Sequence, residues 1–210
     1  IYYPIKSLIN VGINDIIIVT GGQFAGDFLK LLGNGKEFGL EHINYTYQEG
    51  EGGIADALSL CEYYAQGESV CVVLGDNIIE KNLRSAVDKY RAAEEKGAMI
   101  LLKEVEDPHR FGVAEIKADK ITKIVEKPKN PASNYAVTGF YMYDSKVFDF
   151  IKTLNPSARG ELEITDVNNK YLSLDELKYD FLDGWWTDAG TFDSLHRASN
   201  LVATTGANKI

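Results

Sequence analysis

The chain has 210 residues and a formal net charge of −9, from 31 acidic and 22 basic residues, so nucleic acids and anionic membranes are unfavourable partners. Its 45% hydrophobic content suits a globular protein with one sizeable core, and no segment reaches the ~18 apolar residues that cross a bilayer. Cys61 and Cys71 both lie in apolar segments, which indicates reduced thiols rather than a disulfide and therefore a cytoplasmic protein.

The first half of the chain predicts alternating helices and strands. Residues 70–74 are continuously apolar and mostly β-branched, as expected of a parallel strand buried on both faces beneath helices. In chain order the expected elements are a helix over 4–12, a strand over 15–20, a helix over 24–32, a strand over 43–48, a helix over 54–65, a strand over 70–74, a helix over 81–96 and a strand over 98–103. Such alternation is typical of α/β proteins.

The second half changes character near residue 111. Short alternating segments at 112–117, 121–126 and 137–143 predict antiparallel strands laid beside the parallel core. Next come expected helices over 145–154 and 161–172, a strand over 177–182, a loop over 185–191 and a helix over 192–202. We therefore predict one α/β domain over residues 1–210, with a Rossmann-like, mostly parallel mixed sheet flanked by helices and an added antiparallel part.

A carboxylate follows the strand expected over 70–74. Gly75 makes a turn there, and Asp76 would emerge at the carboxyl end of the strand, where ligands bind in open α/β sheets. In that place Asp76 could hold a metal over a substrate. The alternative is that Asp76 and Asn77 simply form a turn, for which both residue types have local preferences.

A glycine-rich stretch follows the strand expected over 43–48. Residues 49–53 contain three glycines, which let a ligand approach the backbone closely. Gln48 offers both a donor and an acceptor, the combination that reads the edge of a pyrimidine base. A solvent-exposed loop carrying a hydrated glutamine is the competing interpretation.

Eight stretches of the chain, taken in order, form one pattern. They are IYYP (1–4), Gln48 with GIADA (53–57), LGDN (74–77), RFGV (110–113), VEKP (125–128), YAVTG (135–139), SARGELEITD (157–166) and WTDAGT (186–191). The pattern resembles the sugar-1-phosphate nucleotidylyltransferases, and most closely the members that use dTTP and glucose 1-phosphate. It covers nearly the whole chain in the family's order, so the set is far more specific than any single stretch.

The resemblance implies a reaction and a cofactor, Mg²⁺. A phosphate oxygen of glucose 1-phosphate attacks the α-phosphorus of dTTP (or UTP), pyrophosphate leaves and dTDP-glucose forms, a step of dTDP-deoxysugar (rhamnose-type) and polysaccharide biosynthesis. Because two anions must meet, charge neutralisation and in-line positioning supply most of the rate. The antiparallel part would then form the sugar side of the site.

The resemblance also implies a role for each matching residue. Asp76 and Asp188 are expected to bind Mg²⁺, which prefers oxygen ligands. Lys127 and Arg159 are expected to act with Asp76 in catalysis, Lys127 as a point charge and Arg159 as a bidentate fork on the sugar phosphate. The expected substrate-binding residues are Gln48 and Gly53 for the base, and Gly112, Glu126, Val137, Tyr141 and Glu161 for the sugar.

One family feature is absent from residues 1–210. Family members begin with a strand and a glycine-rich loop that carries an arginine, followed by a lysine, and this loop wraps the triphosphate. We therefore expect an N-terminally truncated fragment that keeps the sugar side of the pocket and uses dTTP poorly. We also expect a gap in the sheet beside the strand over 15–20 or 70–74.

Several alternatives stay open at the level of sequence. The chain could use UTP or another sugar phosphate, because one methyl group in a pocket changes binding by only about 1–3 kcal/mol. It could be a catalytically silent module that binds sugar nucleotides. A metal-dependent glycosyltransferase would normally show two aspartates one residue apart, whereas Asn77 and Ile78 follow Asp76 here. A homo-oligomer is also compatible with the sequence.

Overall fold

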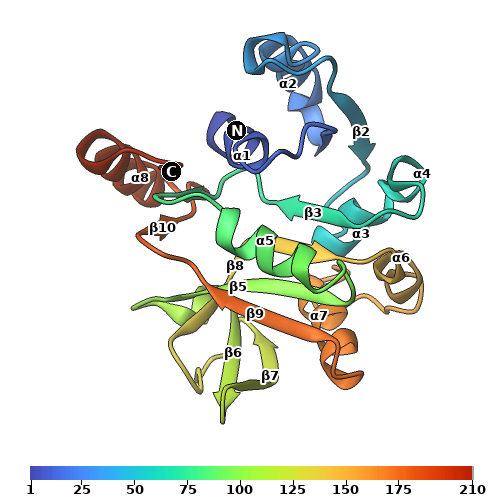
Figure 1. Ribbon diagram of the computed structural model, residues 1–210, viewed down its shortest axis with the longest axis vertical. Coiled ribbons are helices and arrows are strands. Elements are labelled where there is room, and N and C mark those ends of the chain that lie inside the picture. Colours follow the sequence, from blue (N-terminus) through green and yellow to red (C-terminus); the bar gives the residue numbers. More distant parts are fainter. Residues whose placement is uncertain (210) are drawn as a thin grey trace.

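The computed structural model describes residues 1–209 and has a mixed β-sheet with helices on both faces (Figure 1). The predicted α/β class is confirmed, and most predicted elements are present within a few residues of their expected ends. Among residues 1–209, no helix is long and apolar enough to cross a membrane.

The N-terminal part forms a small unit of its own at one end of the molecule (Figure 1). It contains α1 (Tyr2–Ile9), β1 (Ile17–Gly21), the 3-10 turns η1 (Gly22–Phe24) and η2 (Lys36–Phe38), α2 (Ala25–Leu32) and β2 (Asn44–Gln48). Strands β1 and β2 pair in parallel, with Gly21 opposite Gln48. Buried Ile5, Ile16 and Leu32 are part of the apolar cluster that holds this unit together.

The main sheet is organised around β8 (Tyr135–Tyr143), which pairs antiparallel with three other strands. These are β3 (Val70–Val73), β5 (Ala98–Glu104) and β6 (Gly112–Lys117). Strand β9 (Leu177–Phe181) pairs in parallel with β5, and β7 (Lys120–Glu126) forms a hairpin with β6. The antiparallel strand therefore lies in the middle of the sheet, and the expectation that it would lie beside a parallel core was wrong.

Successive side chains of β8 face two different cores, as the pleat of a strand requires. Val137 and Tyr141 pack in a cluster with α3 (Ile54–Ser59), α6 (Lys146–Ile151) and α7 (Ile164–Ser173). Phe140 and Met142 pack on the opposite face with α5 (Arg84–Ala92). The helices thus bury both faces of this strand.

Four of the predicted elements differ from the structure. The helix expected over 54–65 ends at Ser59, whose hydroxyl donates to the Asp56 carbonyl at 2.6 Å, and a short α4 (Glu62–Ala65) follows. The helix expected over 161–172 begins only at Ile164, because Glu163 has extended backbone (ψ 129°). The helix expected over 81–96 is the shorter α5. The loop expected over 185–191 contains β10 (Trp186–Thr187), which pairs antiparallel with the unpredicted β4 (Ile78–Ile79).

The last helix, α8 (Phe192–Thr205), begins at a capping box. The Ser194 backbone N–H donates to Thr191 Oγ1 at 3.1 Å, and the Thr191 backbone N–H donates to Ser194 Oγ at 3.0 Å. These bonds satisfy donors that a helix start leaves free. The cap residue, Thr191, lies three residues after Asp188 and fixes the start of α8 at Phe192.

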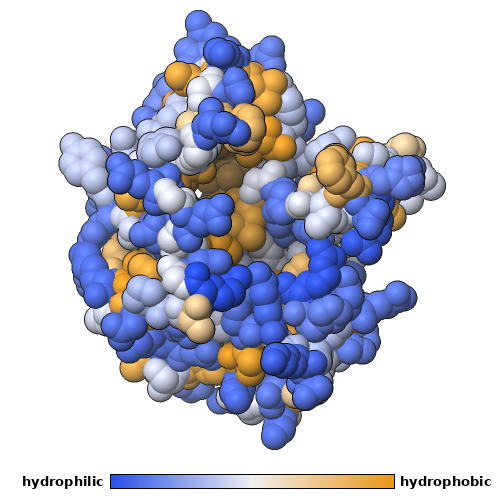
Figure 2. Space-filling view, turned by 180° about the vertical axis from the view of Figure 1, so that it is seen from behind, coloured by the Kyte–Doolittle hydropathy of each residue, from blue (hydrophilic) through white to orange (hydrophobic). Residues whose placement is uncertain are grey.

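An apolar groove of about 850 Å³ separates the N-terminal unit from the main sheet. Isoleucines of β1 and valines of β3 line it, and Figure 2 shows a hollow with hydrophobic side chains inside it. Within residues 1–209, β1 pairs only with β2 and β3 only with β8. The expected gap beside these strands is confirmed, and β3 is half-buried rather than covered on both faces as we had expected.

Candidate functional site

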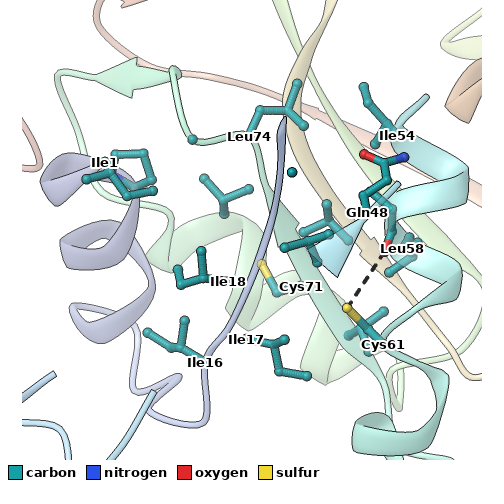
Figure 3. Close-up of a pocket in the computed structure, with 18 of the residues that line it drawn as sticks. Ile1, Ile16, Ile17, Ile18, Gln48, Ile54, Leu58, Cys61, Cys71 and Leu74 are labelled. Carbon is teal, nitrogen blue, oxygen red and sulfur yellow. Dashed lines mark hydrogen bonds between the residues drawn. The ribbon is translucent and has the colours of Figure 1, made fainter. Parts of the chain in front are cut away.

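A cavity of about 270 Å³ lies between the loop after β3, the end of β7 and the loop before α7. It brings together nine of the residues singled out in the sequence: Asp76, Gly112, Glu126, Lys127, Val137, Tyr141, Arg159, Glu161 and Asp188. The other two, Gln48 and Gly53, line the apolar groove next to it (Figure 3 labels Gln48). Ile54, Leu74 and Glu161 line both spaces, so the groove and the cavity are adjacent.

Asn77 fixes the position of Asp76. Its side chain is 3% exposed, and its Nδ2 donates to Asp76 Oδ1 at 2.8 Å. Asn77 Oδ1 accepts from the Gly139 N–H at 3.0 Å and from Trp186 Nε1 at 2.7 Å. Asn77 is therefore more than a turn residue, because it ties Asp76 to both β8 and β10.

Asp188 lies directly after β10 and faces Asp76 across Gly190. A Cβ on Gly190 would lie 3.0 Å from Asp76 Oδ2 and 3.6 Å from Asp188 Oδ2, so both oxygens come close to one point. Asp188 Oδ2 accepts from Arg110 Nη2 at 2.9 Å and from Ser194 Oγ at 3.2 Å. Any side chain at position 190 would press on Asp76.

The two carboxylates fit a Mg²⁺ ion whose other ligands would come from a substrate and from water. No group of three or more His, Cys, Asp or Glu side chains in residues 1–209 could hold a metal. Mg²⁺ is usually bound through one or two carboxylates, with phosphate oxygens and waters as the remaining ligands. Arg110 already places a positive charge on Asp188, and the hydrogen bond from Arg110 to Asp107 is the main cause of the raised pKa of Arg110. Asp188 therefore already has one cationic partner, Arg110, at 2.9 Å.

Arg159 is surrounded by three glutamates. Its Nε donates to Glu163 Oε1 at 3.1 Å and its Nη2 to Glu163 Oε2 at 2.7 Å, a bidentate pair. Glu161 lies 3.2 Å and Glu126 3.7 Å from the same Nη2. The expected bidentate geometry of Arg159 is therefore taken by Glu163, and Nη1 is the guanidinium nitrogen without a hydrogen bond among residues 1–209.

Glu163 is held in its ionised form. Burial works to raise the pKa of Glu163, but hydrogen bonds from Arg159 and from Ser157 outweigh it and lower the pKa below its ordinary value. The Ser157 Oγ–H donates to Glu163 Oε1 at 2.6 Å. The same contacts hold the loop before α7 against the cavity.

Lys127 has an unusual backbone for a lysine. Its φ is +40°, in the left-handed region, and its backbone N–H donates to the Phe111 carbonyl at 3.0 Å. Non-glycine residues in that region are strained and are often found at functional sites. The preceding residue, Glu126, accepts a hydrogen bond at Oε2 from Thr165 Oγ1 at 2.5 Å.

Gln48 uses its donor group within the protein. Its Nε2 donates to Asp56 Oδ2 at 2.7 Å and to the Gly53 carbonyl at 3.0 Å. Gly53 has a φ of +93°, and a Cβ there would lie 2.6 Å from the Leu162 carbonyl oxygen. Position 53 thus needs glycine both for its conformation and for its close approach to the Glu161–Leu162 backbone.

Sequence reasoning missed the residues that orient these side chains. They are Asp56, Asn77, Arg110, Glu163 and Thr165. Each lies inside one of the eight matched stretches, so the stretches marked them without indicating their contacts. Those contacts join residues 1 to 109 positions apart, and the distant ones required the fold.

Comparisons with known proteins point to one family. Residues 1–205 match the family model described as nucleotidyl transferase. The glucose-1-phosphate thymidylyltransferase of Neisseria meningitidis serogroup A is 42% identical over 207 residues, which are 97% of this chain and 72% of that protein. The protein of the same name from Actinoplanes sp. is 40% identical over 206 residues, or 96% of this chain and 67% of that protein.

Solved structures give the same result. A Bacillus anthracis protein assigned as glucose-1-phosphate thymidylyltransferase, in complex with a sucrose, is 50% identical with a TM-score of 0.91, over 97% of this chain and 82% of that one. A UDP-glucose pyrophosphorylase complexed with UDP-glucose has a TM-score of 0.81 at 22% identity, over 96% of this chain and 85% of that one. At that identity the second structure shows a common fold.

Proposed function

Because this chain belongs to the nucleotidyl transferase family and is a nucleotidyltransferase acting on a sugar 1-phosphate, we propose that it converts dTTP and glucose 1-phosphate into dTDP-glucose and pyrophosphate. A phosphate oxygen of the sugar forms a bond to the α-phosphorus of dTTP. The bond from that phosphorus to the β-phosphate breaks, and pyrophosphate leaves with the electron pair. Positioning and charge neutralisation carry such a reaction.

The sugar phosphate enters beside Lys127 in this proposal. Lys127 is an exposed cation at the cavity, and its strained backbone supports a role that an ordinary loop residue would not need. Arg159 reaches the same phosphate through Nη1, while Glu163 holds the rest of its guanidinium in place. The two cations orient the attacking oxygen and offset its charge.

Carboxylates and backbone on the sugar side accept and enclose the hydroxyl groups. Thr165 orients the Glu126 carboxylate, and Arg159 holds Glu161 at 3.2 Å. Val137 and Tyr141 form an apolar wall, and a Cβ on Gly112 would come within 3.3 Å of Glu126 Oε2. This combination of carboxylates and a close backbone suits a polyhydroxylated ring.

In this proposal, Asp76 and Asp188 are the residues that would bind the metal ion. Asn77 keeps Asp76 fixed, and Ser194 with Arg110 keeps Asp188 fixed, so both carboxylates are oriented before a substrate binds. When bound there, Mg²⁺ neutralises charge on the α-phosphate and on the leaving pyrophosphate. The thymine base lies at Gln48 and Gly53, on the groove side of Glu161.

One observation carries the proposal. Two aspartates, three cations and three glutamates, from stretches spread over residues 76–188, line one cavity of about 270 Å³. A chance surface cluster would not combine converging carboxylates with a separate cationic pair. The arrangement supports transfer between two phosphate-bearing substrates.

The test measures pyrophosphate release from dTTP, with Mg²⁺ and glucose 1-phosphate, and identifies dTDP-glucose by mass spectrometry. We expect release that depends on glucose 1-phosphate, that EDTA abolishes, and that is slower with UTP. Asp188→Asn should lose activity, whereas Asp119→Asn, in the exposed turn between β6 and β7, should keep it. Absence of both turnover and dTDP-glucose binding would contradict the proposal, and binding without turnover would leave only a binding role.

A further inference from the structure

The Gln48 amide is oriented by two acceptors. Its Nε2 lies 2.7 Å from Asp56 Oδ2 and 3.0 Å from the Gly53 carbonyl oxygen. The opposite orientation would place the Gln48 amide oxygen against the Gly53 carbonyl oxygen and the Asp56 carboxylate. A carbonyl oxygen and an ionised carboxylate only accept hydrogen bonds, so neither could pair with the amide oxygen. The hydrogen-bond network therefore allows one orientation of this side chain.

The acceptor half of the amide faces the groove as a result. In Figure 3 the Gln48 amide oxygen lies on the groove side, with the amide nitrogen turned away from it. Within the described part of the chain, the hydrogen bonds of this amide all use Nε2. Gln48 thus presents Oε1 alone to a ligand, and the expectation that it offers a donor and an acceptor together was wrong.

Asp56 is itself held in place. It is the third residue of α3, and a Cβ on Gly52 would lie 2.4 Å from its Oδ2, so the carboxylate is packed against the backbone before the helix. The Gln48 backbone is equally fixed, because it pairs with Gly21 and leaves no room there for a side chain: a Cβ on Gly21 would lie 2.5 Å from the Gln48 carbonyl oxygen. Neither partner can easily move away from the other.

We propose that Asp56 is a positioning residue that determines base specificity, by locking Gln48 as an acceptor and so selecting pyrimidines with a protonated ring nitrogen. Thymine and uracil carry a hydrogen on N3, which donates to Gln48 Oε1. Cytosine has an unprotonated N3, which would meet that oxygen lone pair to lone pair. This inference rests on the proposed function, because it assumes that a nucleotide base lies at Gln48.

The consequence concerns one hydrogen bond and its orientation, so a near-isosteric change can test it. Asp56→Asn keeps the shape, but its amide can also donate to Gln48, so the Gly53 carbonyl alone then opposes the orientation that presents Nε2 to the groove. Asp56→Ala removes the charged and shorter of the two contacts and leaves only the Gly53 carbonyl to orient the amide. Both variants should lose discrimination between thymine and cytosine while still binding the rest of the nucleotide.

The experiment titrates dTMP and dCMP into the wild-type chain and its variants by ligand-observed NMR, which detects weak binding. We expect the wild type to prefer dTMP by about 10- to 100-fold, a range typical of a mispaired polar group in a site. The preference should fall about tenfold or more in Asp56→Asn and Asp56→Ala. Glu49→Gln removes a charge next to Gln48 from an exposed side chain and should keep the wild-type ratio.

The ratio of the two affinities separates specificity from stability, because partial unfolding lowers both affinities equally. A wild-type preference that persists in both Asp56 variants would overturn the inference and leave the proposed function intact. Absence of nucleotide binding by the wild type would overturn both. Equal wild-type binding of dTMP and dCMP, with pyrophosphate still released from dTTP, would overturn the inference alone.

Discussion

Replacing Asn77 with alanine should destabilise the chain strongly for a single polar side chain. Asn77 is 3% exposed and accepts from the Gly139 N–H and from Trp186 Nε1, so both donors lose their acceptor in Asn77→Ala. A buried donor left unpaired costs about 1–3 kcal/mol, and the half-buried Trp186 should lie at the low end. The expected loss in the free energy of unfolding is about 3 kcal/mol.

That loss converts into a measurable shift in melting temperature. For a chain of this size, 1 kcal/mol corresponds to about 2–4 °C, so Asn77→Ala should melt about 6–12 °C below the wild type. Differential scanning calorimetry measures the shift, and Asn130→Ala, at an exposed asparagine, is the matched control. A shift in Asn77→Ala no larger than in the control would refute the reasoning.

The same change should reduce nucleotidyl transfer even below the melting range. Asp76 loses the Nδ2 donor at 2.8 Å, and its carboxylate is then free to rotate away from Asp188. Asn77→Asp keeps both acceptor contacts but sets two carboxylates against each other, so it should be the more stable variant and still be impaired. Full activity in Asn77→Asp would show that the orientation of Asp76 is set elsewhere.

Three further predictions concern the charged groups of the cavity. Arg110→Gln removes the guanidinium that pairs with Asp188 and would compete with a metal ion for this carboxylate. We therefore expect Mn²⁺ to bind the substrate-free variant more tightly than the wild type, as measured by electron paramagnetic resonance. Weaker binding would contradict a competing role for Arg110. Lys127→Gly relieves the strain of a φ of +40°, so this variant should melt no lower than the wild type and at a higher temperature than Lys127→Ala, although it loses transfer activity. A lower melting temperature than that of Lys127→Ala would argue against strain at this position. Burial works to raise the pKa of Glu163, but hydrogen bonds from Arg159 and Ser157 hold this pKa below its ordinary value of 4.5. The ionised Glu163 therefore stabilises the fold above pH 4.5, and this stabilisation is lost as the pH falls through the lowered pKa. Glu163→Gln should therefore melt lower than the wild type at pH 7, and the difference in melting temperature, measured by scanning fluorimetry, should shrink on acidification; a constant difference would exclude ionisation of Glu163 as its source.

The sequence predicted elements well where the signal was local. The strand over 112–117 was placed at its observed ends, Gly112 and Lys117, because its apolar residues alternate and turn residues follow. The helix over 54–65 was predicted as continuous, whereas α3 ends at Ser59, whose hydroxyl donates to the Asp56 carbonyl. Periodicity reports which face is buried and is silent about such hydrogen bonds.

The arrangement of strands was less accessible from sequence. Strand β8 lies antiparallel between β3 and β5, and its residues after Tyr135 are all buried; its nearly continuous apolar run is typical of a strand covered on both faces, whereas the prediction interpreted it as an alternating strand of an added sheet. The cavity residues were identified through the eight stretches, and their contacts were not. The pairing of Arg110 with Asp188 joins residues 78 positions apart, which composition and spacing do not reveal.

Because β8 pairs with three strands and faces two cores, the shape of the cavity and the stability of the sheet depend on the same nine residues. Val137 and Tyr141 form the cavity wall, while Phe140 and Met142 pack beneath α5. Substitutions of Val137 and Tyr141 should therefore affect the cavity and the core together, whereas substitutions of Phe140 and Met142 should affect folding first. A shift of β8 by one residue would turn the side chains that now face the cavity toward α5, and those that now pack under α5 toward the cavity. New sugar preferences would then have to arise in the loops around the cavity.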